Sequence, residues 1–144
     1  MIKIICIGKI KENYLKDAIN DYQKRISKYH KIEIVELPDS FIDNEKELIK
    51  KNINSKDYII TMEIEGNMLS SIELSEKIDK TFITNPNITF IIGGSTGLHP
   101  EIKNISNYKL SFSKLTFPHG LFRLILLEQI YRSFKILNNE SYHK

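Results

Sequence analysis

The sequence predicts an α/β protein in which a mainly parallel sheet is flanked by helices. Short apolar runs alternate along the chain with segments whose apolar residues recur at helical spacing. Parallel neighbouring strands need long crossovers, and a helix is the usual one. With 144 residues, 41% of them hydrophobic, the chain suffices for one core, so we expect a single domain over residues 1–144.

The first half of the chain is expected to form three strands and two helices. The nearly continuous apolar run from Ile2 to Gly8 is typical of a buried strand, and apolar residues at helical spacing follow between 14 and 26. Residues 32–37 predict a second strand that a proline ends. Residues 48–53 predict a short, exposed helix, and residues 57–62 a third strand.

A capping signal opens the next helix. Ser70 and Glu73 have the spacing of a capping box, which predicts a helix from there to about Phe82. Residues 88–92 predict a fourth strand. Residues 93–97 contain three glycines and are expected to leave that strand in a turn.

The last third departs from this simple alternation. A short helix is expected over 100–106 and a fifth strand over 108–112. Residues 113–120 predict a loop, because the proline within them disfavours helix in the residue before it. A long helix follows over 121–137, and 11 of the 18 residues from 120 to 137 are apolar or aromatic. Such a helix is either enclosed within its own chain or packed on a second copy, and we favour a homodimer.

Charge is unevenly distributed along the chain. Residues 1–31 carry 8 basic and 3 acidic groups, residues 32–80 carry 6 and 12, and residues 81–144 carry 7 and 3. If the fold joins the two basic ends, the resulting face suits the phosphates of RNA. Ordinary surface lysine is the alternative explanation.

The composition argues against several classes of protein. The single cysteine, Cys6, forms no internal disulfide and no charged-then-apolar leader precedes the first strand, so we expect a cytoplasmic protein. No run approaches the roughly 20 apolar residues that span a bilayer. No metal-ligand spacing such as HExxH or CxxC occurs, so we predict neither a metal nor membrane association.

Two loops at the carboxyl ends of predicted strands are candidate binding sites. The glycines of 93–97 let the backbone approach a ligand, but their spacing matches neither the dinucleotide fingerprint nor a P-loop. The hydroxyls and backbone of residues 113–120, with the start of the following helix, can bind a carboxylate, an adenine edge or a phosphate. A plain turn and a capping loop are the structural alternatives.

Two further features have a chemical interpretation. Arg123 falls on the same helical stripe as Leu127 and Ile130, so it needs an anionic partner, either in a structural ion pair or in a ligand or RNA. The chain ends in Tyr142, His143 and Lys144, residue types that stack on and hydrogen-bond an extruded base. A serine hydrolase is disfavoured, because the glycine turn falls one residue short of a GxSxG elbow.

Four segments of the sequence resemble the RlmH-type rRNA methyltransferases. They are Phe90–Leu98, Leu110–His119, Glu128–Arg132 and the closing Tyr142–Lys144, and their order, spacing and terminal position all match. The likeness extends over essentially the whole chain. The resemblance implies a SPOUT-type fold whose C-terminal segment threads a deep trefoil knot, and it implies a homodimer.

The resemblance also implies an activity and a cofactor site. The activity is S-adenosylmethionine-dependent methylation of N3 of a pseudouridine in a stem-loop of 23S rRNA on the assembled ribosome. The cofactor residues that it assigns are Met62, Gly93, Phe112, Ser113, Lys114, Leu115, Thr116 and Phe117. Met62 departs from the leucine expected there, and the exchange conserves volume.

The expected mechanism is direct methyl transfer, in which the protein positions the reactants and excludes water. The N3 proton must leave, so we expect a general base, with His143 as first choice and His119 as second. The predicted catalytic residues are His143, His119 and Arg123. The predicted RNA contacts are Arg132, Tyr142, His143 and Lys144.

Two rival hypotheses remain at this point. One is a non-catalytic RNA-binding or ribosome-associated factor with the same fold, which has no use for Gly93 or for the backbone of residues 113–117. The other is a small nucleotide-binding enzyme, which would bind NAD or ATP.

Overall fold

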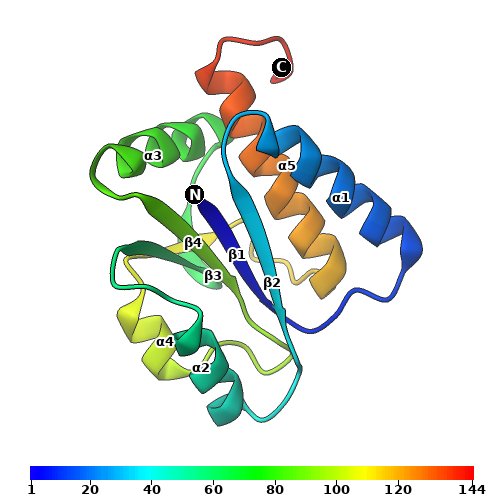
Figure 1. Cartoon of the computed structure of the whole chain (residues 1–144), viewed down its shortest axis with the longest axis vertical. Helices are drawn as coiled ribbons and strands as arrows, with labels where there is room; N and C mark the ends of the chain where they lie inside the picture. The colour runs from blue at the N-terminus through cyan, green and yellow to red at the C-terminus, as the bar shows by residue number, and fades with distance from the viewer.

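The computed structural model describes all 144 residues and shows a five-stranded sheet with helices on both faces (Figure 1). In chain order its elements are β1 (Ile2–Ile7), α1 (Asn13–Ser27), β2 (Ile32–Leu37), α2 (Ile42–Lys51), β3 (Asp57–Met68), α3 (Ser71–Thr84), β4 (Asn87–Ile92), α4 (Pro100–Ile105), β5 (Tyr108–Ser111) and α5 (His119–Leu137). The strand order is β2-β1-β4-β3-β5, and every neighbouring pair is parallel. The predicted fold class is confirmed.

Alternate residues of the central strands face two separate cores. In β1, Ile4 and Cys6 belong to the core that α1, α3 and α5 cover, whereas Ile5 and Ile7 belong to the core under α2 and α4. This alternation follows from the two-residue period of a strand whose faces are both covered. Burial raises the pKa of the Cys6 thiol to about 12, so this cysteine is not a nucleophile at neutral pH.

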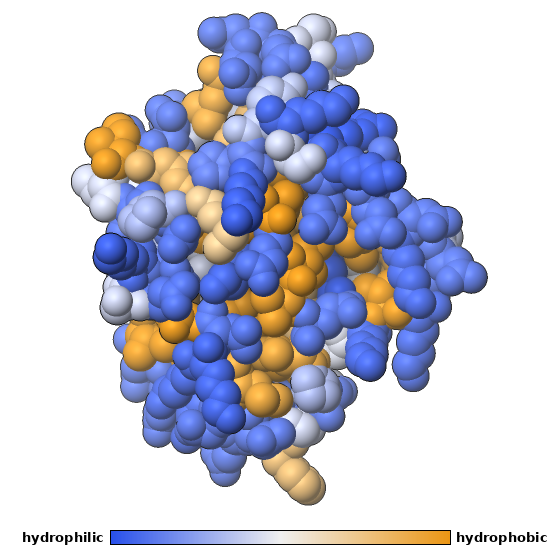
Figure 2. Space-filling view, viewed as in Figure 1, coloured by the Kyte–Doolittle hydropathy of each residue, from blue (hydrophilic) through white to orange (hydrophobic).

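The surface is mostly hydrophilic on the face that Figure 2 shows. Hydrophobic side chains surface there in a band along the middle, where β1 and β2 lie in Figure 1. None of the helices combines the length and the apolar content that crossing a bilayer requires.

β3 is longer than the predicted strand, which stopped at Met62. Met62 and Asn67 both pair with Leu110 of β5, so the residues between them bulge out of the ladder. Gly66 allows this path, because a Cβ there would lie 2.8 Å from the backbone carbonyl of Lys109. The hydrophobic pattern did not predict this continuation, because the bulge interrupts the strand's regular pairing.

α5 begins at His119, two residues before the predicted start, and ends at Leu137 as predicted. Pro118 precedes it in an extended conformation and does not interrupt it. α5 packs against α1 on one side and α3 on the other, so much of its apolar surface is covered within the chain. Leu121 nevertheless remains 40% exposed.

Candidate active site

A pocket of about 410 Å³ opens at the carboxyl ends of β4 and β5 and beside the bulge in the middle of β3. This is the edge of a parallel sheet where ligands usually bind, and the volume lies in the range of small-molecule sites. Its walls come from the bulge of β3, the turn after β4, and the segment between β5 and α5. The pocket therefore unites the two loops that the sequence singles out.

The glycine turn after β4 gives the pocket a bare backbone wall. The Gly97 amide donates to the Gly94 carbonyl at 3.0 Å, which closes the turn. A Cβ on Gly93 would lie 2.9 Å from the carbonyl carbon of Gly97, so a side chain there displaces backbone. Gly97 itself has φ +79°, in the left-handed region that favours glycine.

The segment after β5 is held by its own serines and forms an aromatic wall. The Ser111 hydroxyl donates to the Ser113 carbonyl at 3.1 Å, and the Leu115 amide donates to the Ser113 hydroxyl at 2.9 Å. Phe112 and Phe117 lie 5.5 and 6.1 Å from Phe122 of α5, centroid to centroid. These rings provide an apolar surface on which a planar base can pack.

Charged side chains stand at the other side of the pocket. Glu63 and Glu65, from the bulge of β3, and Lys103, from α4, all line it. The Glu63 carboxylate accepts from the Thr61 hydroxyl at 2.7 Å and lies 3.8 Å from the Lys103 ammonium. The pocket thus offers both signs of charge beside an apolar wall.

The pocket contains most of the residues that the resemblance assigns to the cofactor. Those that line it are Met62, Gly93, Phe112, Ser113, Leu115, Thr116 and Phe117. Lys114 is exposed and lies outside the lining. His119 lines the pocket from the first position of α5. The sequence reasoning missed Glu63, Glu65 and Lys103, because their approach depends on the bulge and on the packing of α4.

Arg123 lies outside the pocket lining and makes a structural ion pair. Its side chain is 3% exposed and donates through Nη1 to the carboxylate of Glu36 and through Nη2 to the Gly8 carbonyl at 3.2 Å. The sequence left open whether the anionic partner of Arg123 is a structural carboxylate or a ligand or RNA, and the structure shows a carboxylate of the same chain. No three His, Cys, Asp or Glu side chains lie close enough together to hold a metal ion.

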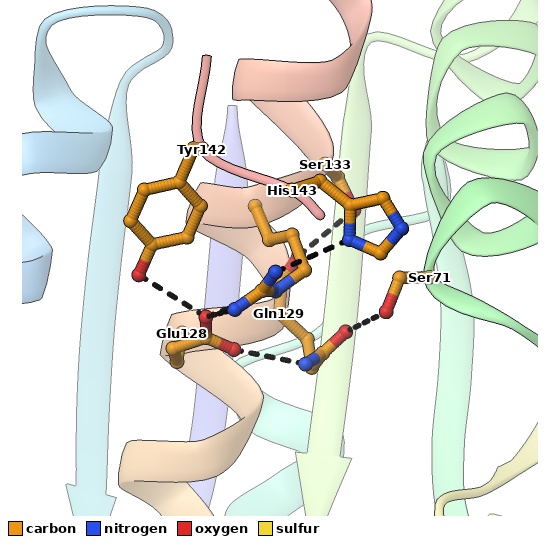
Figure 3. A network of polar contacts seen from close by, with 7 residues as sticks. Ser71, Glu128, Gln129, Ser133, Tyr142 and His143 are labelled. Atoms are coloured by element: carbon orange, nitrogen blue, oxygen red, sulfur yellow. Dashed lines mark hydrogen bonds and ion pairs between the residues drawn. The ribbon is translucent and has the colours of Figure 1, made fainter.

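The C-terminal tail folds back on α5 (Figure 3). The Tyr142 hydroxyl donates to Glu128 Oε1 at 3.2 Å, and its ring stands edge-on to Tyr131 at 5.0 Å. Burial raises the pKa of the Tyr142 hydroxyl. Arg132 contacts His143 at 3.1 Å. Lys144 is exposed.

Comparison with known proteins places this fold and pocket in a family. The chain matches the family described as "Predicted SPOUT methyltransferase" over residues 1–143. It belongs to the SPOUT methyltransferases, whose methyl donor is S-adenosylmethionine.

Sequence relatives match over nearly their full length. The ribosomal RNA large subunit methyltransferases H of Clostridium botulinum and Clostridium beijerinckii are 52% and 48% identical, over 99% of this chain and 99% of each relative.

Solved structures with low sequence identity show the same fold. A protein from Haemophilus influenzae described as a "probable methylase family protein" superposes with a TM-score of 0.59 at 14% identity, over 99% of this chain and 70% of that one. The SpoU methyltransferase AviRb from Streptomyces viridochromogenes, in complex with AdoMet, gives 0.51 at 10% identity, over 92% and 57%.

The residues present fit S-adenosylmethionine chemically. The cofactor combines a planar adenine with a ribose, a carboxylate and two cationic groups. The aromatic wall suits the adenine, the serine and threonine hydroxyls suit the ribose, and the charged side offers carboxylates and an ammonium. The glycine turn exposes backbone where a Cβ would fill the space.

Proposed function

We propose that this protein methylates N3 of a pseudouridine in a stem-loop of 23S rRNA on the assembled ribosome, and that it acts in the cytoplasm as a homodimer. The observation that carries the proposal is the pocket: all but Lys114 of the residues that the resemblance assigns to the cofactor converge there from β3, from the turn after β4 and from the segment after β5. The names of the sequence relatives support ribosomal RNA as the substrate.

The protein's own part in the reaction is positioning. S-adenosylmethionine, when bound, supplies an electrophilic methyl group for transfer to a nucleophilic nitrogen. The glycine turn and the serine-held segment after β5 fix the pocket wall, and the three phenylalanines exclude water from it. Orientation and desolvation of this kind account for much of the rate of a two-substrate transfer.

The proton on N3 leaves as the new N–CH₃ bond forms, so a nearby acceptor assists. His119 lines the pocket and is exposed. His143 accepts from Arg132 through Nδ1, so in the docked tail its Nε2 carries a proton and donates. We therefore assign His143 first as a hydrogen-bond donor, through Nε2, to the carbonyl oxygens beside N3. It acts as the general base only when Arg132 no longer donates to Nδ1.

The tail of one chain is remote from its own pocket. His119 lies at the pocket, and Arg132, which contacts His143, stands about 20 Å further along α5 at a rise of about 1.5 Å per residue. A second copy can bring its tail to this pocket, which makes the site dependent on the homodimer. Exposed apolar residues provide contact surface for that copy: Ile64 and Leu115, which line the pocket, and Met68, Ile72 and Leu121.

Residues at the C-terminal end of the chain supply the expected RNA contacts. We assign Arg132 and Lys144 to phosphates and Tyr142 to stacking on the target base. In the docked tail Arg132 keeps its ion pair with Glu128, and the guanidinium N–H groups that Glu128 and His143 do not use are available to a phosphate.

Methyl transfer to ribosomes tests the proposal. Ribosomes from a strain that lacks the gene are incubated with the protein and S-adenosylmethionine labelled in the methyl group, beside isolated large subunits and bare rRNA. We expect label in N3-methylpseudouridine of the large-subunit rRNA, with assembled ribosomes as the best substrate. Label in another nucleoside, or preference for bare rRNA, would contradict the substrate assignment. Binding without any transfer would favour a non-catalytic factor.

A further inference from the structure

The carboxylate of Glu128 is the centre of the polar network that holds the tail (Figure 3). Its Oε1 accepts from Arg132 Nη2 at 2.6 Å and Nε at 3.0 Å, and from the Tyr142 hydroxyl at 3.2 Å. Glu128 does not line the cofactor pocket. It contacts two residues of the proposed RNA-binding set without being placed to touch the cofactor.

The second oxygen of the Glu128 carboxylate is linked to the neighbouring helix α3 through Gln129. Glu128 Oε2 accepts from the side-chain nitrogen Nε2 of Gln129 at 2.8 Å. The side-chain oxygen Oε1 of Gln129 in turn accepts from the Ser71 hydroxyl of α3 at 2.7 Å. The side chains of Glu128 and Arg132 are only 19% and 24% exposed. Partial removal from water strengthens charge-assisted hydrogen bonds, so this carboxylate is a fixed anchor.

This anchor determines which edge of Arg132 faces the tail. The Nε and Nη2 donors are both used by Glu128, which leaves Nη1 directed at His143 Nδ1, 3.1 Å away. The hydrogen bond to Glu128 raises the pKa of Arg132. A guanidinium has donors only, so Nδ1 must accept and the imidazole proton must sit on Nε2.

We propose that Glu128 is a positioning residue for the tail: through Arg132 it fixes the orientation and tautomer of His143, and through the Tyr142 hydroxyl it fixes the aromatic ring beside it. The tail then presents an Nε2–H donor and a stacking surface in constant geometry. This inference rests on the proposed function, because it assigns the tail a role in binding the target base.

Substitution of Glu128 by glutamine tests the inference in the full-length protein. E128Q keeps the shape and removes the charge that holds Arg132. Nitrogen-15 NMR of the labelled histidines reads the tautomer directly, and only one of the four histidines lies in the tail. We expect His143 to be the Nε2–H tautomer in the wild type and a mixture of both tautomers in E128Q, with partial recovery in E128D. E76Q, on an exposed residue of α3, is the matched control and should leave the signal unchanged.

Kinetics with ribosomes give the second measurement. We expect E128Q to lower kcat at least tenfold and to change the KM for S-adenosylmethionine by less than about twofold, since Glu128 lies outside the cofactor pocket. An unchanged His143 tautomer in E128Q overturns the proposal, whether or not activity falls, because a loss of activity alone would place Glu128 on the substrate. A tautomer change with full activity also overturns it.

Two arrangements keep the test decisive. If E128Q does not fold, R132K replaces it, because lysine keeps the charge but lacks the fork, and the same mixture of tautomers is expected. If the wild type methylates no ribosomal RNA, the proposed function fails. The NMR comparison then still decides whether Glu128 sets the His143 tautomer.

Discussion

The guanidinium of Arg123, at the start of α5, donates to the carboxylate of Glu36, which lies 87 residues earlier near the end of β2. The same guanidinium donates to the Gly8 carbonyl at the end of β1, and the Glu36 carboxylate accepts from the Ile10 amide at 3.2 Å. The pair thus ties α5 to the ends of two strands. It sets the position of the helix whose first residue, His119, lines the pocket.

Removal of either partner should destabilise the fold, and by different amounts. E36A leaves the nearly buried Arg123 charge without its partner, so we expect the free energy of unfolding to fall by about 2–3 kcal/mol, below the full range for buried pairs because Glu36 is one-third exposed. R123M leaves a carboxylate that water can reach, and we expect about 1 kcal/mol. Urea unfolding of both variants checks the order. Equal losses, or a larger loss in R123M, would contradict this assignment of burial.

Gly93 should be intolerant of a side chain. In G93A the new Cβ would lie 2.9 Å from the Gly97 carbonyl carbon, so the turn must shift to make room for it. We expect the affinity for S-adenosylmethionine to fall at least tenfold, equivalent to about 1.4 kcal/mol, while ribosome binding persists. Calorimetric titration and ribosome co-sedimentation measure the two. Unchanged cofactor affinity in a folded G93A would remove the glycine turn from the site.

Deletion of Tyr142 to Lys144 should separate binding from turnover. None of these residues lines the cofactor pocket, so the truncated protein should bind S-adenosylmethionine with wild-type affinity. Methyl transfer should be lost, because the residues assigned to the target base are gone. Normal turnover in the truncated protein would contradict the role of the tail.

His30 should make the stability depend on pH. Its ring stacks on Phe82 at 4.3 Å, and burial lowers its pKa below the ordinary value of about 6.5. The unfolded chain then binds more protons than the folded one, so the free energy of unfolding falls as pH drops through about 6.5. Other groups also titrate between pH 7.5 and 5.5, among them the Met1 amino group, whose pKa burial lowers, so urea unfolding over this range is compared between the wild type and H30F. H30F should flatten the dependence, and curves of equal slope would exclude His30 as its source.

Local patterns in the sequence predicted which elements occur, although α2 spans Ile42–Lys51 and not residues 48–53, and they predicted long-range partners poorly. Both hydrogen bonds of the predicted capping box between Ser70 and Glu73 are present. This prediction succeeds because a capping box depends only on four consecutive residues. The continuation of β3 past Met62 depends instead on how closely Gly66 approaches Lys109. No local pattern contains that information.

The candidate site shows the same division. The apolar stripe around Arg123 indicated that it needs an anion but not that Glu36 provides it. The assignment of residues 112–117 to the cofactor came from the family resemblance, and hydrophobic spacing alone predicted only a loop there. The sequence analysis included Glu128 in a segment of the family resemblance but gave it no role, since its contacts with the tail appear only when the tail folds back onto α5. The trefoil knot stays a prediction of the resemblance.

The most direct test of the central claim, that this pocket is the S-adenosylmethionine site, is calorimetric titration of the purified protein. S-adenosylmethionine and its demethylated product are titrated separately, with NAD and ATP as controls. We predict micromolar binding of the first two and none of the controls, with binding weakened in G93A and retained after deletion of the tail. Binding of NAD or ATP, or no binding of S-adenosylmethionine by the folded protein, would contradict the account.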